Sequence, residues 1–201
     1  MWTKRLRLAL WILVGVAAGS YVWLYSTAGS EKPENLIANV KVQELGGPFE
    51  LTDQHGHGVS QADVAGKPYA VFFGFTHCPD VCPTTLFTLS EQLKALGPAA
   101  DKLKVFFVSV DPERDTREQL ELYMTSFDPR IQALTGTTEN IDRMIKNFRA
   151  YYGKVPNAGS YTMDHTAVVY LMDAQGRFMT TLDAHEGADI QLGKLKRLLD
   201  S

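Results

Sequence analysis

The chain has 201 residues, of which 45% are hydrophobic and 21% are charged. This is the composition of a globular protein, and it excludes a disordered chain, a collagen-like repeat and a disulfide-dense miniprotein. The first 30 residues hold three basic side chains and no acidic one, so the remainder has 17 Lys and Arg against 23 Asp and Glu, a net charge of −6 that argues against nucleic-acid binding.

The chain opens with an apolar segment that is long enough to cross a membrane. Leu8–Tyr25 is apolar almost throughout, and a helix of this length spans nearly the roughly 30 Å of a bilayer's hydrocarbon core. Lys4, Arg5 and Arg7 precede the segment, and positive charges of this kind stay in the cytoplasm. We therefore predict a single uncleaved anchor in a bacterial inner membrane, with the rest of the chain in the periplasm. A cleaved signal peptide is the alternative.

The chain is predicted to divide into an anchor, a tether and one folded domain. Residues 1–30 contain the cytoplasmic tail and the transmembrane anchor. Residues 31–48 include Pro33 and the sequence Gly-Gly-Pro at their end and are predicted to form a tether. Residues 49–201 have the length of a single domain of ordinary size.

From residue 49 onward, predicted strands and helices alternate. In chain order we expect a hairpin over 49–60, a strand over 69–75, a helix over 82–96, a strand over 104–110, helices over 116–127 and 140–151, strands over 166–172 and 177–182, and a closing helix over 188–199. The strand over 69–75 (YAVFFGF) is apolar throughout, as expected of a central strand that is buried on both faces. This order predicts an α/β domain with a thioredoxin-like fold, in which a central mixed sheet with an N-terminal hairpin is flanked by helices and carries an insertion.

The two cysteines of the chain, Cys78 and Cys82, lie in the segment FTHCPDVCPTT. This segment follows the first buried strand and precedes the first long helix, at the edge of the sheet where α/β proteins build their sites. We expect Cys82 to cap the helix and Pro83 to be its first residue. Both thiols then lie at a helix N-terminus, which favours the thiolate that binds metal or attacks a disulfide. A structural disulfide bond is the alternative, but it would close too short a loop to constrain the unfolded chain much.

One histidine is predicted to approach the cysteines from a distant part of the sequence. His165 precedes a strand that is expected to pair with the strand over 69–75, which brings its leading end close to the cysteine loop. Two thiolates and one imidazole are poor ligands for Mg²⁺ or Ca²⁺ and good ligands for copper, and Cu(I) accepts three of them. A zinc site with an open position fits the same residues. His77, Asp80 and Met163 are candidates for an extra ligand, with local packing as the simpler interpretation.

Taken together, these residues resemble the SCO/SenC family of membrane-anchored, thioredoxin-like proteins. The similarity rests on the CPxxCP block, on VSVDPERD over 108–115 and on DHTAVVYLMD over 164–173, and it covers most of the predicted domain as well as the anchor. The resemblance implies one copper ion per chain, Cu(I) or Cu(II), bound by Cys78, Cys82 and His165. It also implies a metallochaperone rather than an enzyme, which helps to metallate the dinuclear copper centre of cytochrome c oxidase, with the copper-bearing oxidase subunit and other copper carriers as partners.

Two other functions fit parts of the same pattern. A thiol–disulfide oxidoreductase that keeps copper-site cysteines reduced would use Cys78 and Cys82 as its redox pair. However, the spacing is C-x₃-C rather than C-x-x-C, and His165 stands where thioredoxins carry a cis-proline. Residues 81–84 (VCPT) also match a stretch of peroxiredoxins, which place a threonine at a nearby position that is proline here. The segment Asp111–Asp115 ends a predicted strand on the side of the site, and we interpret it as a loop with a helix cap.

Overall fold

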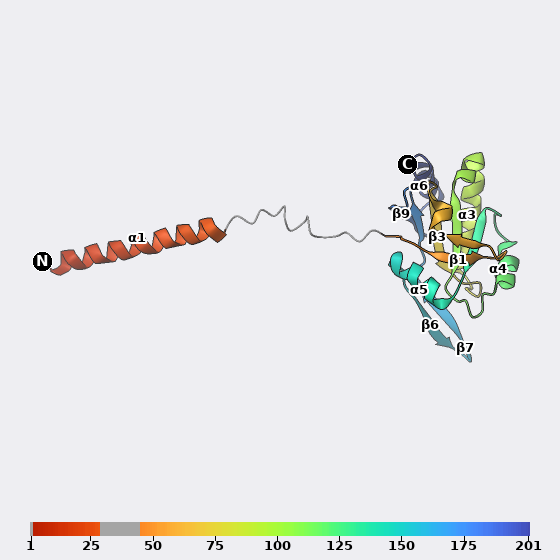
Figure 1. Ribbon diagram of the computed structural model, residues 1–201, viewed down its shortest axis with the longest axis horizontal. Helices are drawn as coiled ribbons and strands as arrows, with labels where there is room; N and C mark the ends of the chain where they lie inside the picture. The colour runs from red at the N-terminus through yellow and green to blue at the C-terminus, as the bar shows by residue number, and fades with distance from the viewer. Residues whose placement is uncertain (1, 29–44) are drawn as a thin grey trace. The chain divides into compact units, whose positions relative to one another are not determined.

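Figure 1 shows the computed structural model of the protein, which describes residues 2–28 and 45–201. Helix α1 (Trp2–Ala28) contains the predicted membrane-spanning segment. Its stretch Ala9–Ser26 has a mean hydropathy of 1.5, so the helix is long and apolar enough to cross a membrane. Most of the predicted tether, residues 31–44, lies outside the described residues.

The domain is built on a mixed sheet, which has seven strands within residues 45–201, in the order β2-β1-β5-β4-β3-β8-β9. In chain order, the strands of this sheet are β1 (Glu50–Asp53), β2 (Gly58–Ser60), β3 (Tyr69–Gly74), β4 (Lys104–Ser109), β5 (Ile131–Thr135), β8 (Val169–Met172) and β9 (Phe178–Leu182). The central strands β3, β4 and β5 run parallel, whereas β8 pairs antiparallel with β3. The predicted hairpin over 49–60 and the predicted pairing of the strand over 166–172 with the central strand are therefore confirmed.

Helices cover both faces of this sheet. They are α3 (Val81–Leu96), α4 (Arg117–Met124), α5 (Thr138–Asn147) and α6 (Ala188–Leu199), with short 3₁₀ helices at Gln61–Val64 and Gly97–Lys102. Successive residues of β3 point to opposite faces. Phe73 packs edge-on against Phe148, directly after α5, with ring centroids 5.6 Å apart. On the other face, Gly74 contacts Cys82 of α3, and α6 packs beside α3 (Figure 1). The domain thus has the predicted thioredoxin-like arrangement of a mixed sheet between helices.

The structure adds a second sheet that has no counterpart in the predicted elements. Strands β6 (Tyr152–Asn157) and β7 (Ser160–His165) form an antiparallel hairpin that projects from the main sheet (Figure 1). Because most of β6 is exposed, it lacks the alternation of apolar and polar residues that indicates a strand. His165 is the last residue of β7, and β8 begins only at Val169. The predicted strand over 166–172 therefore exists but begins three residues later than predicted, and the placement of His165 at its leading end is wrong, because His165 belongs to the hairpin.

The last residues of the predicted tether contact the domain. The backbone N–H of Gly46 donates to the carbonyl of Asn147 at 2.9 Å, and the Asn147 side chain donates to the carbonyl of Pro48 at 2.9 Å. Gly46 has a φ of +93°, and a Cβ there would lie 2.6 Å from the terminal carbon of Met172. The left-handed φ favours glycine at this position, and the hydrogen bonds with Asn147 join the start of the domain to the end of α5.

Candidate metal centre

The two cysteines lie on either side of the start of α3. Cys78 lies in the loop after β3, and Cys82 is the second residue of α3, which begins at Val81. The helix therefore starts earlier than predicted, and Cys82 lies inside the first turn instead of capping it. The first N–H groups of a helix have no partner within it. The N–H of Cys82 is one of them, and it donates to Sγ of Cys78 at 3.4 Å.

A glycine leaves room for the sulfur of Cys82. A Cβ at Gly74, the last residue of β3, would lie 2.8 Å from Cys82 Sγ and 2.6 Å from Cε2 of Phe107. Real side chains do not tolerate contacts this short, so the sulfur occupies the space that a side chain at this position would need. Cys82 is fully buried, whereas Cys78 is partly exposed. One sulfur of the pair is therefore open to a ligand or partner.

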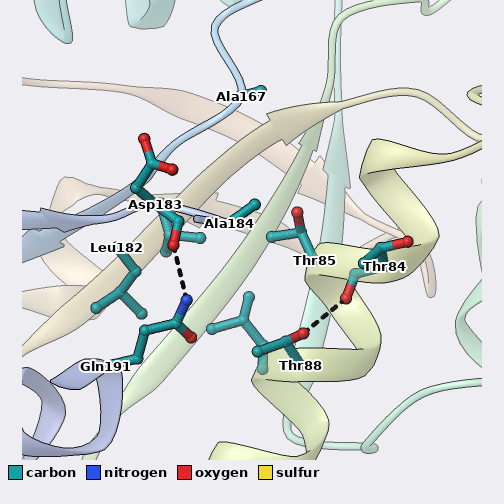
Figure 2. Close-up of a pocket in the computed structure, with 10 residues that line it drawn as sticks. Thr84, Thr85, Thr88, Ala167, Leu182, Asp183, Ala184 and Gln191 are labelled. Atoms are coloured by element: carbon teal, nitrogen blue, oxygen red, sulfur yellow. Dashed lines mark hydrogen bonds between the residues drawn. The ribbon is translucent and has the colours of Figure 1, made fainter. Parts of the chain in front are cut away.

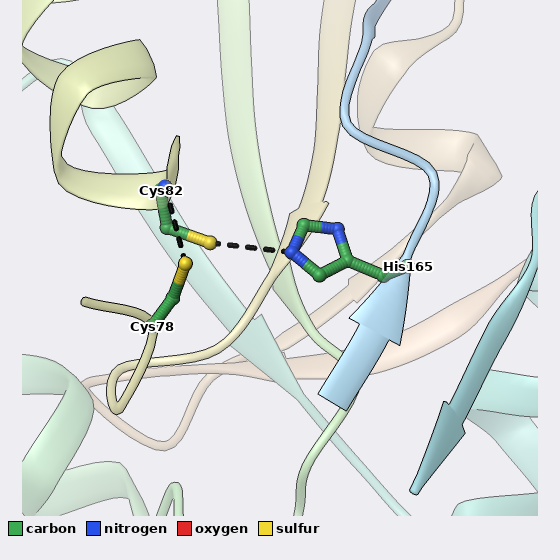
Figure 3. A group of neighbouring side chains, drawn as sticks. All are labelled: Cys78, Cys82 and His165. Atoms are coloured by element: carbon green, nitrogen blue, oxygen red, sulfur yellow. Dashed lines mark hydrogen bonds between the residues drawn. The ribbon is translucent and has the colours of Figure 1, made fainter. Parts of the chain in front are cut away.

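The His165 side chain points from the end of β7 toward the two sulfurs (Figure 3). Its Nε2 lies 3.5 Å from Sγ of Cys82. Phe72 and Phe75 pack edge-on against the ring, with centroids 6.2 and 5.8 Å away. Nδ1 lies 3.1 Å from the carbonyl oxygen of Thr166. Because a carbonyl only accepts, Nδ1 carries a proton, and Nε2 is the ring nitrogen that faces the sulfurs and is available to a metal ion.

These three side chains are close enough to share one metal ion. The two Sγ atoms and a ring nitrogen of His165 all lie within 4.8 Å of one another, and no other such group of His, Cys, Asp or Glu occurs in the part of the chain that the structure describes. Three atoms so separated have a common point within about 2.8 Å of each, while bonds from Zn²⁺ to nitrogen and sulfur, taken as a guide, measure about 2.0–2.3 Å. Shifts of about half an ångström bring all three into bonding range. His77 and Asp80 do not belong to the cluster, and Met163 is buried in the core.

The two thiols differ strongly in acidity. The pKa of Cys78 is lowered to about 4, mainly by the hydrogen bond from the Cys82 thiol, with smaller contributions from His165 and from the N–H groups of Asp80 and Cys82, which together outweigh the opposite effect of partial burial. The same hydrogen bond, together with burial, raises the pKa of Cys82 far above its ordinary range. The pair therefore loses its first proton from Cys78, which is a thiolate at neutral pH, while Cys82 keeps its proton.

The cluster opens onto a groove between the cysteine loop and β7. The groove has a volume of about 400 Å³ and is lined by Phe75, Cys78, Pro79, Asp80, Val81, Thr162, Met163, Asp164, His165 and Ala167. A second cavity lies between α3 and the residues that follow β9, where Thr88 and Gln191 bond to nearby carbonyls (Figure 2). Its volume of about 40 Å³ suits a water molecule and is too small for an organic substrate. Of these two cavities, only the groove at the cysteines is large enough to admit a ligand or a partner's side chain.

Some residues around the cluster are not singled out by the sequence patterns. Gly74 could have been found from the sequence, because a glycine inside an apolar strand indicates a close approach of another group. The segment Asp111–Asp115 is predicted to end in a helix cap, but the cap of α4 is Thr116, whose hydroxyl accepts from the N–H of Gln119. The carboxylates of Asp111 and Asp115 are instead buried and bonded to the surroundings of the metal centre.

Most of the chain is similar to proteins of one known family. A family model described as SCO1/SenC matches residues 38–200. Protein sco1 of Schizosaccharomyces pombe is 34% identical over 176 residues, which cover 82% of this chain and 67% of that protein. The mitochondrial SCO1 homolog of Homo sapiens is 39% identical over 140 residues, which cover 67% of this chain but only 46% of the human protein. A structure of Bradyrhizobium japonicum ScoI with copper bound has a TM-score of 0.72 and 49% identity, and the match covers 77% of this chain and 99% of the ScoI chain.

Proposed function

The chain belongs to the SCO1/SenC family, and we propose that it is a membrane-anchored copper chaperone. Its domain binds one copper ion through Cys78, Cys82 and His165 and delivers it to the dinuclear copper centre of cytochrome c oxidase. The observation that carries this proposal is the cluster of two sulfurs and one imidazole nitrogen within 4.8 Å of one another. It is supported by the 49% identity to ScoI, a protein solved with copper bound.

The donor set favours copper over the other common biological metals. Mg²⁺ and Ca²⁺ prefer oxygen ligands, and the cluster contains no carboxylate. Structural zinc sites take four protein ligands, which this cluster does not supply. A zinc site with an open position would accept the same three residues, and over that alternative the copper-bound structure of the similar ScoI favours copper. Cu(I) is satisfied by two thiolates and one imidazole, and Cu(II) takes a fourth ligand from the open groove.

Copper binding depends on the difference in acidity and exposure between the two thiols. Cys78 is ionised at neutral pH and partly exposed, so its sulfur is the first that an incoming ion meets. Cys82 releases its proton when the ion binds, which makes the affinity depend on pH. The bond from His165 to the Thr166 carbonyl keeps Nε2 free for the ion. The groove beside Cys78 gives the cysteines of an acceptor access to the bound copper.

The proposed location follows from α1 and from the charges that precede its apolar stretch. We place α1 as an uncleaved anchor in a bacterial inner membrane, with Lys4, Arg5 and Arg7 in the cytoplasm. Residues 31–48 act as a tether, and residues 49–201 form the periplasmic copper-binding domain. The domain then works beside the membrane-bound oxidase, whose copper-bearing subunit is the proposed acceptor, while other copper carriers are the proposed donors.

The acidity of Cys78 also favours a second function, thiol–disulfide exchange. A low-pKa, partly exposed cysteine followed by a buried protonated one is suited to reduce a disulfide. The Cys78 thiolate attacks the target disulfide and displaces one target sulfur as a thiolate, which takes up a proton. The Cys82 thiol then loses its proton, forms the Cys78–Cys82 disulfide and releases the second target sulfur. The target gains two electrons, and the cysteine pair loses two.

The copper content of the full chain, purified in detergent, tests the chaperone function. Wild type is compared with Cys78→Ser, Cys82→Ser and His165→Ala after loading and dialysis against a chelator. His77→Ala is the matched control, because it removes an imidazole next to Cys78 that is not part of the cluster. We expect about one copper ion per chain in wild type and control, and loss of copper in the three ligand variants. Equal retention by all five proteins would refute the copper site.

Reduction of a small disulfide substrate separates the two functions. If the chain turns over such a substrate and His165→Ala leaves that rate unchanged, exchange is the main activity and copper binding is secondary. If the rate is negligible while copper binds with the expected stoichiometry, the chaperone function stands alone. The same preparations serve both measurements.

A further inference from the structure

The hairpin that carries His165 is separate from the main sheet. Within the described residues, β6 and β7 pair with each other and with no other strand. A two-stranded hairpin is marginally stable by itself, so its contacts with the rest of the domain decide where its side chains stand. At the base of the hairpin, the Tyr152 hydroxyl donates to Asp142 of α5 at 2.6 Å, and the N–H of Thr166 donates to the carbonyl of Tyr151 at 3.0 Å. Further along β7, another contact comes from the segment between β4 and α4.

Arg114, in that segment, contacts Tyr161 of β7 in two ways. Its Nη1 donates to the Tyr161 carbonyl at 2.9 Å, and its guanidinium carbon lies 3.8 Å from the centre of the Tyr161 ring. Nε of Arg114 also donates to Asp111, which in turn accepts from the Tyr161 hydroxyl at 2.8 Å. Because Asp111 is only 1% exposed, this ring of charge-assisted bonds is shielded from water and has a defined geometry. We call these three residues the Asp111–Arg114–Tyr161 latch.

The other end of the same segment holds the cysteine loop. Asp115 is fully buried and accepts from the N–H of Thr76 at 3.0 Å and from its hydroxyl at 2.6 Å. It also accepts from the hydroxyl of Ser109 at the end of β4, at 2.6 Å. Thr76 lies two residues before Cys78. One short turn, Asp111–Asp115, therefore bonds to the loop that carries a sulfur and to the hairpin that carries the imidazole.

We propose that Arg114, together with Asp111 and Tyr161, is a positioning residue for His165, a statement that rests on the proposed copper function. The latch holds β7 at the distance from the cysteine loop at which the three ligand atoms meet. The guanidinium also lies 5.9 Å from the ring centre of Phe75, which packs edge-on against the His165 ring. The arginine thus acts on the imidazole through the hairpin backbone and through Phe75, since its hydrogen bonds go to Asp111 and Tyr161.

Two substitutions weaken the latch without exposing the core. Arg114→Lys keeps a positive charge beside Asp111 but lacks the fork that bonds Asp111 and Tyr161 together. Tyr161→Phe removes only the hydroxyl bond to Asp111 and serves as the milder variant. Lys154→Met is the matched control, because it removes an exposed ion pair with Glu113 at 2.6 Å between the same hairpin and the same segment. It also removes the ammonium group that lies 4.6 Å from the centre of the Tyr161 ring, but it leaves all the hydrogen bonds of the latch in place. Exposed pairs of this kind contribute little.

The main measurement is the Cu(I) affinity of the full chain in detergent, by competition with a chromophoric chelator. Residues that orient metal ligands typically change affinity 10–100-fold when substituted, so we expect Arg114→Lys to weaken binding about tenfold and Tyr161→Phe to weaken it less. Lys154→Met should change it less than about twofold. In the His165→Ala background, Arg114→Lys should have no further effect, because the ligand that it positions is absent. In the electron paramagnetic resonance spectrum of the Cu(II) form, the nitrogen hyperfine coupling from the imidazole should weaken in Arg114→Lys and persist in Lys154→Met.

Each outcome decides for or against the latch. If Arg114→Lys lowers the Cu(I) affinity equally in the wild-type and His165→Ala backgrounds, Arg114 acts on the fold and not on His165, and the proposal is overturned. No loss of affinity in either background would also overturn it. If wild type itself binds no copper, the copper function fails, and amide hydrogen exchange of the metal-free protein decides on the latch. Faster exchange over β6 and β7 in Arg114→Lys than in Lys154→Met then supports the latch, and equal exchange overturns it.

Discussion

Substitution of Gly74 by alanine tests how closely the sulfur of Cys82 is packed. The added methyl group would lie 2.8 Å from Cys82 Sγ and 2.6 Å from Cε2 of Phe107. Ordinary contacts between such atoms are about 3.5–4.0 Å, so the sulfur and the ring must each move by roughly 1 Å. Cys82 and Phe107 are both fully buried, which leaves them no open space to move into.

Gly74→Ala should therefore lower both stability and copper affinity. Overpacking of a core typically costs about 1–3 kcal/mol, and for a domain of this size about 1 kcal/mol lowers the melting temperature by roughly 2–4 °C. A functional site needs its groups within about 0.5 Å of their productive positions, and the Cys82 sulfur is displaced by more than that. We expect Cu(I) affinity to fall at least about tenfold, which corresponds to about 1.4 kcal/mol.

Thermal unfolding by circular dichroism and chelator competition measure the two effects. Gly58→Ala in β2 is the control, because a Cβ at Gly58 has no atom within 4 Å. The control should keep the wild-type melting temperature to within a few degrees and bind copper with wild-type affinity. If Gly74→Ala behaves like the control, the sulfur is free to adjust and the argument from close packing is incorrect.

Two further predictions concern the protons of the cysteine pair. Because the pKa of Cys78 is lowered to about 4 and the thiolate is the reactive form, alkylation of Cys78 in the metal-free protein should be nearly constant from about pH 8 to about pH 6 and fall as the pH drops through about 4. A rate that rises tenfold per pH unit between about 6 and 8 would indicate an ordinary thiol. Because Cys82 keeps its proton at neutral pH, Cu(I) binding should release one proton from the pair, so that affinity falls about tenfold per unit of decreasing pH between about 8 and 7. Competition titrations at several pH values measure this slope, and a hundredfold change per unit would contradict the assignment.

Patterns along the chain predict six of the seven strands of the main sheet and its four helices, but they miss β5 (Ile131–Thr135), which pairs with β4 inside the sheet. The closing helix spans Ala188–Leu199 as predicted, and the central strand ends within one residue of its prediction. Both elements bury apolar residues in a regular pattern, so each can be recognised from its own short stretch of sequence. β6 has no such signal, because four of its six residues are exposed and Pro156 lies among them. The position of His165 at the end of a hairpin therefore could not be read from the residues around it.

The chemistry of the centre, by contrast, is already present in the order of the residues. A C-x₃-C pair between an apolar strand and a helix, and a histidine before a late strand, point to a soft-metal site, because ligand type and helix position are local properties. The contacts that hold the residues of the site in position arise only when the elements pack together in three dimensions. Arg114 and Tyr161 are 47 residues apart and yet hold one hairpin, and Gly74 makes room for a sulfur on a neighbouring helix. Such contacts leave no repeating pattern along the chain, since they arise when elements that formed separately pack against one another.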